Sequence, residues 1–409
     1  MTVGIEKINA YVGRAKLSLQ RLFEARGLDP ARLDNLLMHE KSIALPCEDS
    51  ITHAVNAAKP IVDSLTPQER ASIRLLIVAT ESGVDFGKSI STYIQHYLDL
   101  PRQCRLFEVK QACYGGTAAL MMAVNTVSAS ADPHFKALVI ATDEARPSAR
   151  MTYAEPSQGM AGVAMLISRK PDVLALDEGA SGLCSYEIMD TCRPTGELET
   201  GDADLSLLSY LDCLSEAYND YAAQVSDTVF ETTFQYLLFH TPFAGMVKGA
   251  HRKLARDLTS FNRQQIEADY QTRVAASVNI ASYVGNTYSA SLYLALVSLL
   301  QTRSPQQPSR IGMFSYGSGC VSEFFSGVVT PDSYKSIMGN IVKSHQDRVE
   351  LSVEAYDHLL DLKKQTAFGV QNISLDPDAY ADIYAAAYQG RKLLTLQGIS
   401  DYHRQYDWS

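Results

Sequence analysis

The stretch EVKQACYGGTAAL, residues 108–120, combines three signals of a layered fold. A short run typical of a strand ends near Val109, a lone cysteine follows at position 113, and two glycines introduce a helix-forming segment. A thiol at a helix start lies near unpaired N–H groups and the positive end of the helix dipole, and both favour the thiolate. The glycines would let a substrate approach the backbone, so that the Cys113 N–H could serve an oxyanion. The alternative is a small buried hydrophobic residue, the commonest fate of a free cysteine.

Around this stretch, apolar strand patterns alternate with helical patterns. Strands are expected at 74–79, 136–141, 162–167 and 235–239, and helices at 114–128, 205–225 and 245–258. Strand and helix alternating in this way predict an α/β fold whose sheets are covered by helices.

An internal echo indicates two related halves. Residues 114–120 and 284–292 both place glycine and small side chains at the start of an apolar helix, a little under half the chain apart. A duplicated fold with two helix starts facing one site would produce this echo. We therefore expect one unit over 1–409, with an N-terminal half of about 1–200 and a C-terminal half of about 201–409.

Composition excludes several classes of function. The net charge of −10 disfavours non-specific nucleic-acid binding. Seven cysteines without a C-x-x-C pair and nine dispersed histidines fit neither a disulfide framework nor a metal site. The chain carries no long uncharged apolar run and no signal-peptide pattern at its start, so no membrane span and a cytoplasmic location are expected.

Besides Cys113, several polar residues end strands or begin helices. His240 ends the strand expected at 235–239, which is where a scaffold presents catalytic groups, although a satisfied histidine near a turn is equally typical. Glu81 follows another strand and is placed for a general base, with Asp85 as its nearest rival. Asn286 begins the second small-residue helix, where asparagine is usually a cap. Residues 314–320 read as a glycine turn whose N–H groups could bind a carbonyl oxygen, or as a plain hairpin turn.

Six ordered motifs together resemble the 3-hydroxy-3-methylglutaryl synthases of the thiolase superfamily, over nearly the full length. They are residues 81–83 (ESG), 109–117 (VKQACYGGT), 154–159 (AEPSQG), 239–243 (FHTPF), 285–289 (GNTYS) and 314–319 (FSYGSG). The resemblance implies a five-layered αβαβα thiolase fold with two pseudo-equivalent halves, and a homodimer.

The resemblance also implies roles for the site residues. Cys113 resembles the nucleophile that receives an acetyl group, Glu81 the base that deprotonates the acetyl methyl, and His240 the group that polarises the acceptor's β-keto oxygen. Asn286 and the turn 315–319, with Ser315 and Gly317, resemble groups lining the acyl site. No cofactor is implied beyond the phosphopantetheine that carries the acyl groups.

Glu81 separates this interpretation from the related decarboxylating ketoacyl synthases, which need no such base. We expect Glu81→Ala to leave acetylation of Cys113 largely intact and to abolish condensation. A catalytically silent docking subunit is a further alternative, but it would usually have lost the cysteine.

Stretches at 35–41, 45–49, 85–89 and 106–111 look more like the polyketide β-branching branch than the primary-metabolism enzymes, which use acetyl-CoA and acetoacetyl-CoA. The implied partners are a donor and an acceptor acyl carrier protein. After Asp143 the chain runs into Pro147 and Ser148, where primary enzymes tend to carry a tyrosine, and Tyr153 is a candidate replacement.

A carrier protein is acidic, so an enzyme of net charge −10 needs a local basic face to dock it. Two groups are candidates for that face: Lys248, Arg252 and Lys253, and Arg14, Lys16 and Arg21. Lys248 is also a candidate substrate-binding residue. The alternative for both groups is an ordinary solvated helix face.

Overall fold

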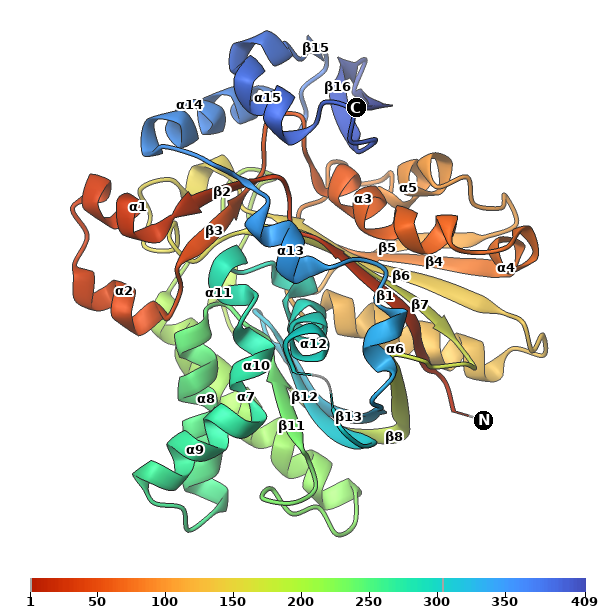
Figure 1. The fold of residues 1–409 in the computed structure, drawn as a ribbon, viewed down its shortest axis with the longest axis vertical. Helices are drawn as coiled ribbons and strands as arrows, with labels where there is room; N and C mark the ends of the chain where they lie inside the picture. Colours follow the sequence, from red (N-terminus) through yellow and green to blue (C-terminus); the bar gives the residue numbers. More distant parts are fainter. Residues whose placement is uncertain (1, 304) are drawn as a thin grey trace.

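A nine-stranded mixed sheet runs through the molecule in the order β11-β12-β13-β8-β1-β7-β6-β4-β5 (Figure 1). The structure is a computed structural model that describes residues 2–303 and 305–409, so Met1 and Ser304 lie outside the described part. The strands are β1 (Gly4–Tyr11), β4 (Ile73–Ala79), β5 (Arg105–Val109), β6 (Lys136–Glu144), β7 (Met160–Ser168), β8 (Leu174–Ser185), β11 (Tyr236–Phe239), β12 (Ser309–Gly317) and β13 (Val321–Val329).

The sheet consists of two halves with the same strand pattern. In the N-terminal half, β1 pairs antiparallel with β7, β7 antiparallel with β6, and β6 parallel with β4. In the C-terminal half, β8, β13, β12 and β11 repeat these pairings in the same order. The halves join where Gly4 and Ile5 of β1 pair with Ala175 and Leu174 of β8. Strand β5 extends the N-terminal half by one further parallel strand.

Helices complete five layers. Helix α3 (Ser50–Asp63) covers the outer face of the N-terminal half, and α7 (Ala203–Gln224) covers the outer face of the C-terminal half. Helices α6 (Gly115–Ala129) and α12 (Ser291–Thr302) lie between the half-sheets and share one hydrophobic core. Helix α12 is buried on all sides from Ser291 to Leu300, whereas α6 also has an exposed face at Met122 and Asn125. The expected α/β fold with an αβαβα arrangement is confirmed.

The expected strands and helices appear as β4, β6, β7, β11, α6, α7 and α8 (Ala244–Leu258). The change from one half to the other falls between Ser168 and Leu174, earlier than the expected boundary near residue 200. The charged segment 193–204 lies inside the C-terminal half and forms part of a small ribbon of β9 (Thr191–Cys192) and β10 (Thr200–Gly201).

Peripheral elements pack around this frame. A three-stranded sheet has the order β14-β2-β3, and another has the order β15-β16-β17. These elements are β2 (Ala15–Ser18), β3 (Glu40–Ile43), β14 (Val349–Glu350), β15 (Ile373–Ser374), β16 (Leu394–Ser400), β17 (His403–Trp408), α1 (Leu19–Arg26), α2 (Pro30–Leu36), α4 (Pro67–Ala71), α5 (Ser91–Tyr97), α9 (Arg263–Arg273), α10 (Ala275–Val278), α11 (Ala281–Val284), α13 (Ile341–Gln346), α14 (Val353–Lys363) and α15 (Ala381–Ala387). Short 3-10 turns include η2 (Tyr288–Ala290), just before α12. In the described residues, no helix is both long and apolar enough to span a bilayer.

Candidate active site

A cavity of about 870 Å³ opens between the two halves of the molecule. Its lining residues come from both halves and include Glu81, Cys113, Gln158, Arg193, Glu199, His240, Asn286 and Tyr288. The nucleophile, base, histidine and asparagine expected from the sequence therefore share one cavity.

The repeated fold explains this convergence. Glu81 follows β4 and His240 follows β11, which occupy equivalent places in the two half-sheets. Cys113 precedes α6 and Asn286 precedes α12, the two helices between the sheets. Each half thus supplies one group at a strand end and one before a central helix. The similar stretches 114–120 and 284–292 lie at the starts of these two central helices.

Cys113 lies after a sharp turn in which Ala112 has a φ of 43°, a left-handed conformation that non-glycine residues seldom adopt. The thiol donates a hydrogen bond to Glu81, with 3.4 Å between Sγ and Oε1. Burial first, and then the Glu81 and Asp143 carboxylates, raise the pKa of the Cys113 thiol well above its ordinary value. Burial and the nearby carboxylates therefore act against the thiolate that a helix start favours.

Gly116, the second glycine after Cys113, serves packing. A Cβ on Gly116 would lie 2.4 Å from the carbonyl oxygen of Ser289 and 2.9 Å from the Tyr293 ring. Gly116 thus lets the start of α6 contact the turn η2 and helix α12. The absence of a side chain at Gly116 therefore permits close contact between the two halves, whereas the sequence suggests that it would permit close approach of a substrate.

Glu81 has an environment suited to a base that works near neutral pH. Burial raises the pKa of Glu81 to about 7, with Arg193 lowering the pKa and Asp143 and Glu199 raising it. The loop is fixed because Asp143 Oδ1 accepts the Glu81 N–H at 2.9 Å. The other oxygen of Asp143 accepts the Ser289 N–H at 3.1 Å, so this buried carboxylate joins the base loop to the turn before α12. Asp85, the rival candidate, accepts local N–H groups of Gly87 and Lys88.

The ribbon that contains β9 and β10 brings a buried ion-pair cluster to the base. Arg193 Nη2 donates to Glu199 Oε2 at 2.9 Å, and Arg193 Nη1 donates to the Glu81 carbonyl at 3.2 Å. Arg193 Nε lies 3.5 Å from Glu81 Oε2. Gln158 Nε2 donates to Glu199 Oε1 at 2.7 Å, and the Tyr288 hydroxyl lies 3.4 Å from Glu199 Oε2.

His240 is held as a neutral imidazole. Its Nδ1 lies 2.6 Å from the Ser291 hydroxyl, which also accepts the Thr241 N–H at 3.3 Å. The Ser291 hydroxyl can donate its own hydrogen to Nδ1 while it accepts the Thr241 N–H, and in that arrangement the ring proton lies on Nε2. Burial lowers the pKa of His240 to about 3. The site therefore offers a neutral N–H donor.

Asn286 lies on the cavity wall, where its side-chain oxygen accepts the Tyr288 N–H at 2.8 Å. Its backbone bonds to the segment 157–159 through Ser157 and Gly159. Ser315 is different: it lies inside β12, and its hydroxyl accepts a hydrogen bond from Thr117 at 2.7 Å. Gly317 packs against Gln111 and Tyr114 behind the cysteine turn. Neither Ser315 nor Gly317 is among the cavity-lining residues, whereas Ser318 of the same turn is.

The remaining substrate-binding candidates lie farther out. Tyr153 lines the cavity, but its side chain is 68% exposed and stacks on Arg32, with 3.7 Å from the guanidinium carbon to the ring centre. Tyr153 therefore lies at the rim, while Tyr288 is the buried tyrosine beside Glu199. Lys248 is not among the cavity-lining residues, and its ammonium pairs with Glu267 at 2.9 Å.

The two basic groups differ in exposure. Arg14 is buried and donates to the carbonyls of Ala387 and Asp347, so the expectation of a docking role for Arg14 is wrong. Lys16 pairs with Glu40 at 2.8 Å, and Arg21 pairs with Glu350 at 2.9 Å.

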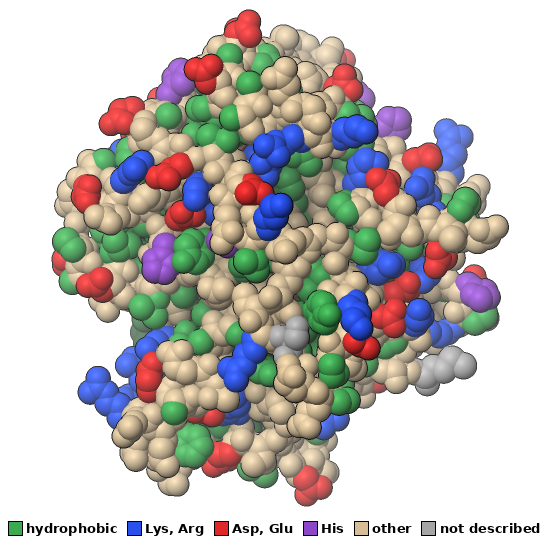
Figure 2. Space-filling model, viewed as in Figure 1, with side chains coloured by type: hydrophobic (Ala, Val, Ile, Leu, Met, Phe, Trp, Pro, Cys, Tyr) green, Lys and Arg blue, Asp and Glu red, His purple; other side chains and the backbone are tan. Residues whose placement is uncertain are grey.

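Arg252 is exposed on α8, and its neighbour Lys253 pairs with Asp257. Lys and Arg side chains gather at the lower left of the face in Figure 2, the region of α8 and α9 in Figure 1. The group on α8 therefore keeps more accessible positive charge than the group of Arg14, Lys16 and Arg21.

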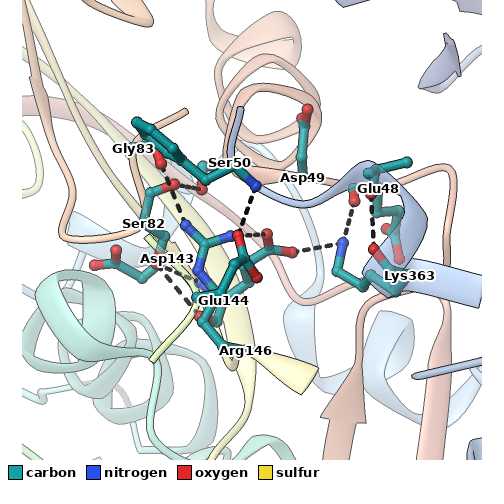
Figure 3. A network of polar contacts seen from close by, with 12 residues as sticks. Glu48, Asp49, Ser50, Ser82, Gly83, Asp143, Glu144, Arg146 and Lys363 are labelled. Atoms are coloured by element: carbon teal, nitrogen blue, oxygen red, sulfur yellow. Dashed lines mark hydrogen bonds and ion pairs between the residues drawn. The ribbon is translucent and has the colours of Figure 1, made fainter. Parts of the chain in front are cut away.

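A buried polar network around Glu144 supports the loop that carries Glu81 (Figure 3). Glu144 pairs with Arg146 at 3.2 Å and with Lys363 of α14 at 2.9 Å. Arg146 donates to the Gly83 carbonyl at 3.2 Å, and the Ser82 hydroxyl accepts the Glu144 N–H at 3.2 Å. The C-terminal helix α14 is thereby connected to the loop that carries Glu81.

Sequence reasoning missed Asp143, Arg193, Glu199 and Ser291. Arg193 and Glu199 lie in a charged, breaker-rich segment that resembles an ordinary loop. Asp143 offered the clearest available signal, because it ends a buried strand in the same way as Glu81. In the part of the chain that the structure describes, no group of three or more His, Cys, Asp or Glu side chains is arranged to hold a metal ion.

Two protein-family models match the chain, one in its N-terminal half and one in its C-terminal half. The model for the N-terminal part of hydroxymethylglutaryl-coenzyme A synthase matches residues 48–172, and the C-terminal model matches residues 256–383. These ranges contain Glu81, Cys113 and Asn286.

Similar proteins include the polyketide biosynthesis 3-hydroxy-3-methylglutaryl-ACP synthase PksG of Bacillus subtilis (strain 168), which is 47% identical over 100% of this chain and 99% of its own length. The hydroxymethylglutaryl-CoA synthase of Enterococcus faecalis is 33% identical over 87% of this chain and 91% of its own. Among solved structures, the HMG synthase of the curacin biosynthetic pathway, in complex with apo donor-ACP, matches with a TM-score of 0.96 and 48% identity over 100% of both chains. MvaS in complex with 3-hydroxy-3-methylglutaryl coenzyme A matches with a TM-score of 0.86 and 33% identity over 100% of this chain and 99% of that one.

Proposed function

Because the chain belongs to the hydroxymethylglutaryl synthase family, we propose that it condenses an acetyl group with a β-ketoacyl chain in polyketide β-branching. The acetyl group comes from a donor acyl carrier protein, and the β-ketoacyl chain is bound to an acceptor carrier protein. The product after hydrolysis is an HMG-like thioester on the acceptor. The observation that carries the proposal is the 3.4 Å contact between Cys113 Sγ and Glu81 Oε1, in a cavity that also holds neutral His240.

The first step is acylation. Cys113 Sγ attacks the acetyl carbonyl, the bond between that carbon and the carrier thiol breaks, and the carrier leaves as a free thiol. Glu81, which accepts the thiol's hydrogen bond in the resting structure, takes the proton of Cys113 and passes it to the departing sulfur. A nucleophile that is neutral at rest therefore becomes a thiolate only in contact with its base.

The second step forms the carbon–carbon bond. Glu81, now without a thiol to pair with, removes a proton from the methyl of acetyl-Cys113. The resulting enolate carbon attacks the β-keto carbon of the acceptor while the His240 ring donates a hydrogen bond that polarises the keto oxygen. That oxygen then takes the proton that Glu81 removed from the methyl, which leaves Glu81 ionised and His240 neutral. A neutral imidazole suits this role because a cation would cost more in a buried site and would also compete for Glu81.

The third step is hydrolysis. Glu81 takes a proton from a water molecule that adds to the Cys113 thioester, the bond between carbon and Sγ breaks, and Glu81 returns the proton to Sγ. The former acetyl unit becomes the free carboxyl group of the product and loses its acid proton to solvent. The thiol returns to its hydrogen bond with Glu81, which completes the cycle.

Carrier-bound and CoA-bound donors distinguish the two branches of the family. The high identity to PksG and to the curacin enzyme, the latter solved with donor-ACP, supports a carrier-bound donor. The test incubates the protein with acetyl-carrier protein and acetyl-CoA in parallel, and follows the acetyl adduct on Cys113 and the condensed product by mass spectrometry. Faster acetylation by the carrier supports the proposal, whereas a preference for acetyl-CoA and acetoacetyl-CoA would make it a primary-metabolism enzyme. Activity with malonyl thioesters that survives loss of Glu81 would make it a ketoacyl synthase.

The family resemblance further supports a homodimer that works in the cytoplasm. Strand β5 ends the large sheet beside the Cys113 turn, and its residues are only partly buried in the single chain. An uncapped edge strand is a natural surface for pairing with a second copy. Light scattering of the purified protein measures the oligomeric state directly.

A further inference from the structure

Arg193 and Glu199 lie on the two arms of the ribbon that contains β9 and β10, and they face each other across it. Their side chains are 10% and 14% exposed, so both charges are largely withdrawn from water. The far end of the ribbon is held by Glu197, whose carboxylate accepts the Phe368 N–H at 2.7 Å. The ribbon therefore places a charge pair from the C-terminal half beside the base of the N-terminal half.

The contacts of Arg193 are uneven. Both terminal nitrogens donate hydrogen bonds, to the Glu81 carbonyl and the Ser82 hydroxyl on one side and to Glu199 on the other. The third donor, Nε, is buried and has no hydrogen-bond partner among the described residues, although Glu81 Oε2 lies 3.5 Å away. A buried, unpartnered donor aimed at a carboxylate is costly unless the contact shortens at some stage of the reaction.

Glu199 is held more tightly than Glu81. It accepts from Arg193 and Gln158, and the Tyr288 hydroxyl is also near. Glu81 has one oxygen toward Cys113 and the other toward Arg193. Thus Glu199 takes the strong hydrogen bond of Arg193 and leaves Glu81 with a weaker attraction. That weaker attraction orients the Glu81 carboxylate without removing its ability to accept a proton.

We propose that Arg193 and Glu199 form a positioning pair that directs the Glu81 carboxylate toward Cys113 and balances the charge around it during condensation. The proposal rests on the function proposed above and adds two residues that do not themselves react. Arg193 orients Glu81, and Glu199 limits how strongly Arg193 stabilises the Glu81 anion.

If Arg193 and Glu199 act as this pair, their removal should shift the pH dependence of condensation in opposite directions. The titratable and charged groups around Glu81 are Cys113 before α6, Asp143 on β6, Arg193 and Glu199 on the ribbon, and Tyr288 on η2. Arg193 lowers the pKa of Glu81, and Glu199 raises it. Removal of the two charges should therefore move the acid limb of condensation in opposite directions, which a merely structural role would not do.

The experiment loads Cys113 with acetyl, adds the β-ketoacyl acceptor and measures single-turnover condensation from about pH 5 to about pH 9. Arg193→Gln should move the acid limb to higher pH by about one unit or more, and Glu199→Gln should move it to lower pH. The double variant should return toward the wild-type midpoint. Arg193→Lys should leave the midpoint near wild type but lower the maximal rate, because a single ammonium replaces the fork of donors.

Glu197→Gln is the matched control, since it removes the same charge from the same ribbon while Glu197 lies outside the cavity lining. A second readout needs no acyl donor. Alkylation of Cys113 by iodoacetamide should be faster in Glu199→Gln than in wild type, because Glu199 raises the pKa of the thiol. Two outcomes would overturn the proposed positioning role. One is an equal shift of the acid limb in Glu197→Gln and Glu199→Gln; the other is a shift of Arg193→Gln and Glu199→Gln in the same direction. Absence of product from wild type would instead overturn the proposed function, and the alkylation readout would still test the pair.

Discussion

The Nδ1 atom of His240 and the hydroxyl of Ser291 lie 2.6 Å apart, and this contact joins the strand-end loop after β11 to the first residue of α12. Because this contact occupies Nδ1, Nε2 is the ring nitrogen that remains for contact with a substrate in the cavity. The histidine is therefore oriented by the same helix that follows Asn286.

Ser291→Ala should lower the rate of condensation by about tenfold to a hundredfold, since the imidazole loses the partner that fixes its tautomer. Acetylation of Cys113 should stay near wild type, because His240 acts on the acceptor. Single-turnover assays of the two steps measure the difference, and Ser291→Thr should restore much of the rate. Equal loss in both steps would show a general distortion of the site.

Glu81→Ala should abolish condensation while acetylation of Cys113 survives. Two effects of the substitution on acetylation oppose each other: the thiol loses its proton acceptor, but it also loses a carboxylate that raises the pKa of the thiol. Intact-mass measurement of the acetyl adduct, followed by addition of acceptor, checks both steps. Condensation at a near wild-type rate would refute the assignment of the base.

His53 should make the protein sensitive to acid. Burial lowers the pKa of His53 from 6.5 to about 3, so below pH 6.5 the unfolded chain binds a proton that the folded chain does not. Relative to His53→Leu, the wild-type free energy of unfolding should fall by about 1.4 kcal/mol for each pH unit below that value. Denaturant titrations of both proteins at several pH values measure this difference. A constant difference across pH would contradict it.

Gly116→Ala should lower the free energy of unfolding by about 1 to 3 kcal/mol, because the new methyl overlaps the Ser289 carbonyl and the Tyr293 ring. Gly249→Ala is the control, since a Cβ at that helical position of α8 meets nothing within 4 Å. The control should be neutral or stabilising by up to about 1 kcal/mol. Similar losses in both variants would contradict the role of Gly116 in contact between the halves.

Charge reversal at Arg252 and Lys253 should weaken acetyl transfer from the carrier protein more than from acetyl-CoA, since only the carrier presents an acidic surface. Arg21→Glu tests the other basic group in the same assay. Transfer kinetics with both donors, at low and high salt, separate docking from chemistry. Equal loss with both donors would rule out α8 as the docking face.

Much of the frame could be predicted from the sequence, because the strands β4, β6 and β7 are buried on both faces and read as continuous apolar runs. Cys113, Glu81 and His240 were found because each lies at the end of such a run or at a helix start. Arg193 and Glu199 could not be found in this way, because they reach Glu81 only through the ribbon of β9 and β10, which folds against the other half. The protonation of Cys113 was also out of reach, because it depends on how many carboxylates surround the thiol and how little water reaches it.

The duplicated architecture has a consequence for how the protein becomes active in the cell. Cys113 and Glu81 belong to the half that is synthesised first, while His240 and Asn286 belong to the half that emerges last. A nascent or truncated chain can therefore present a thiol but cannot complete the site around it. The cavity is therefore complete only when the second half has folded against the first.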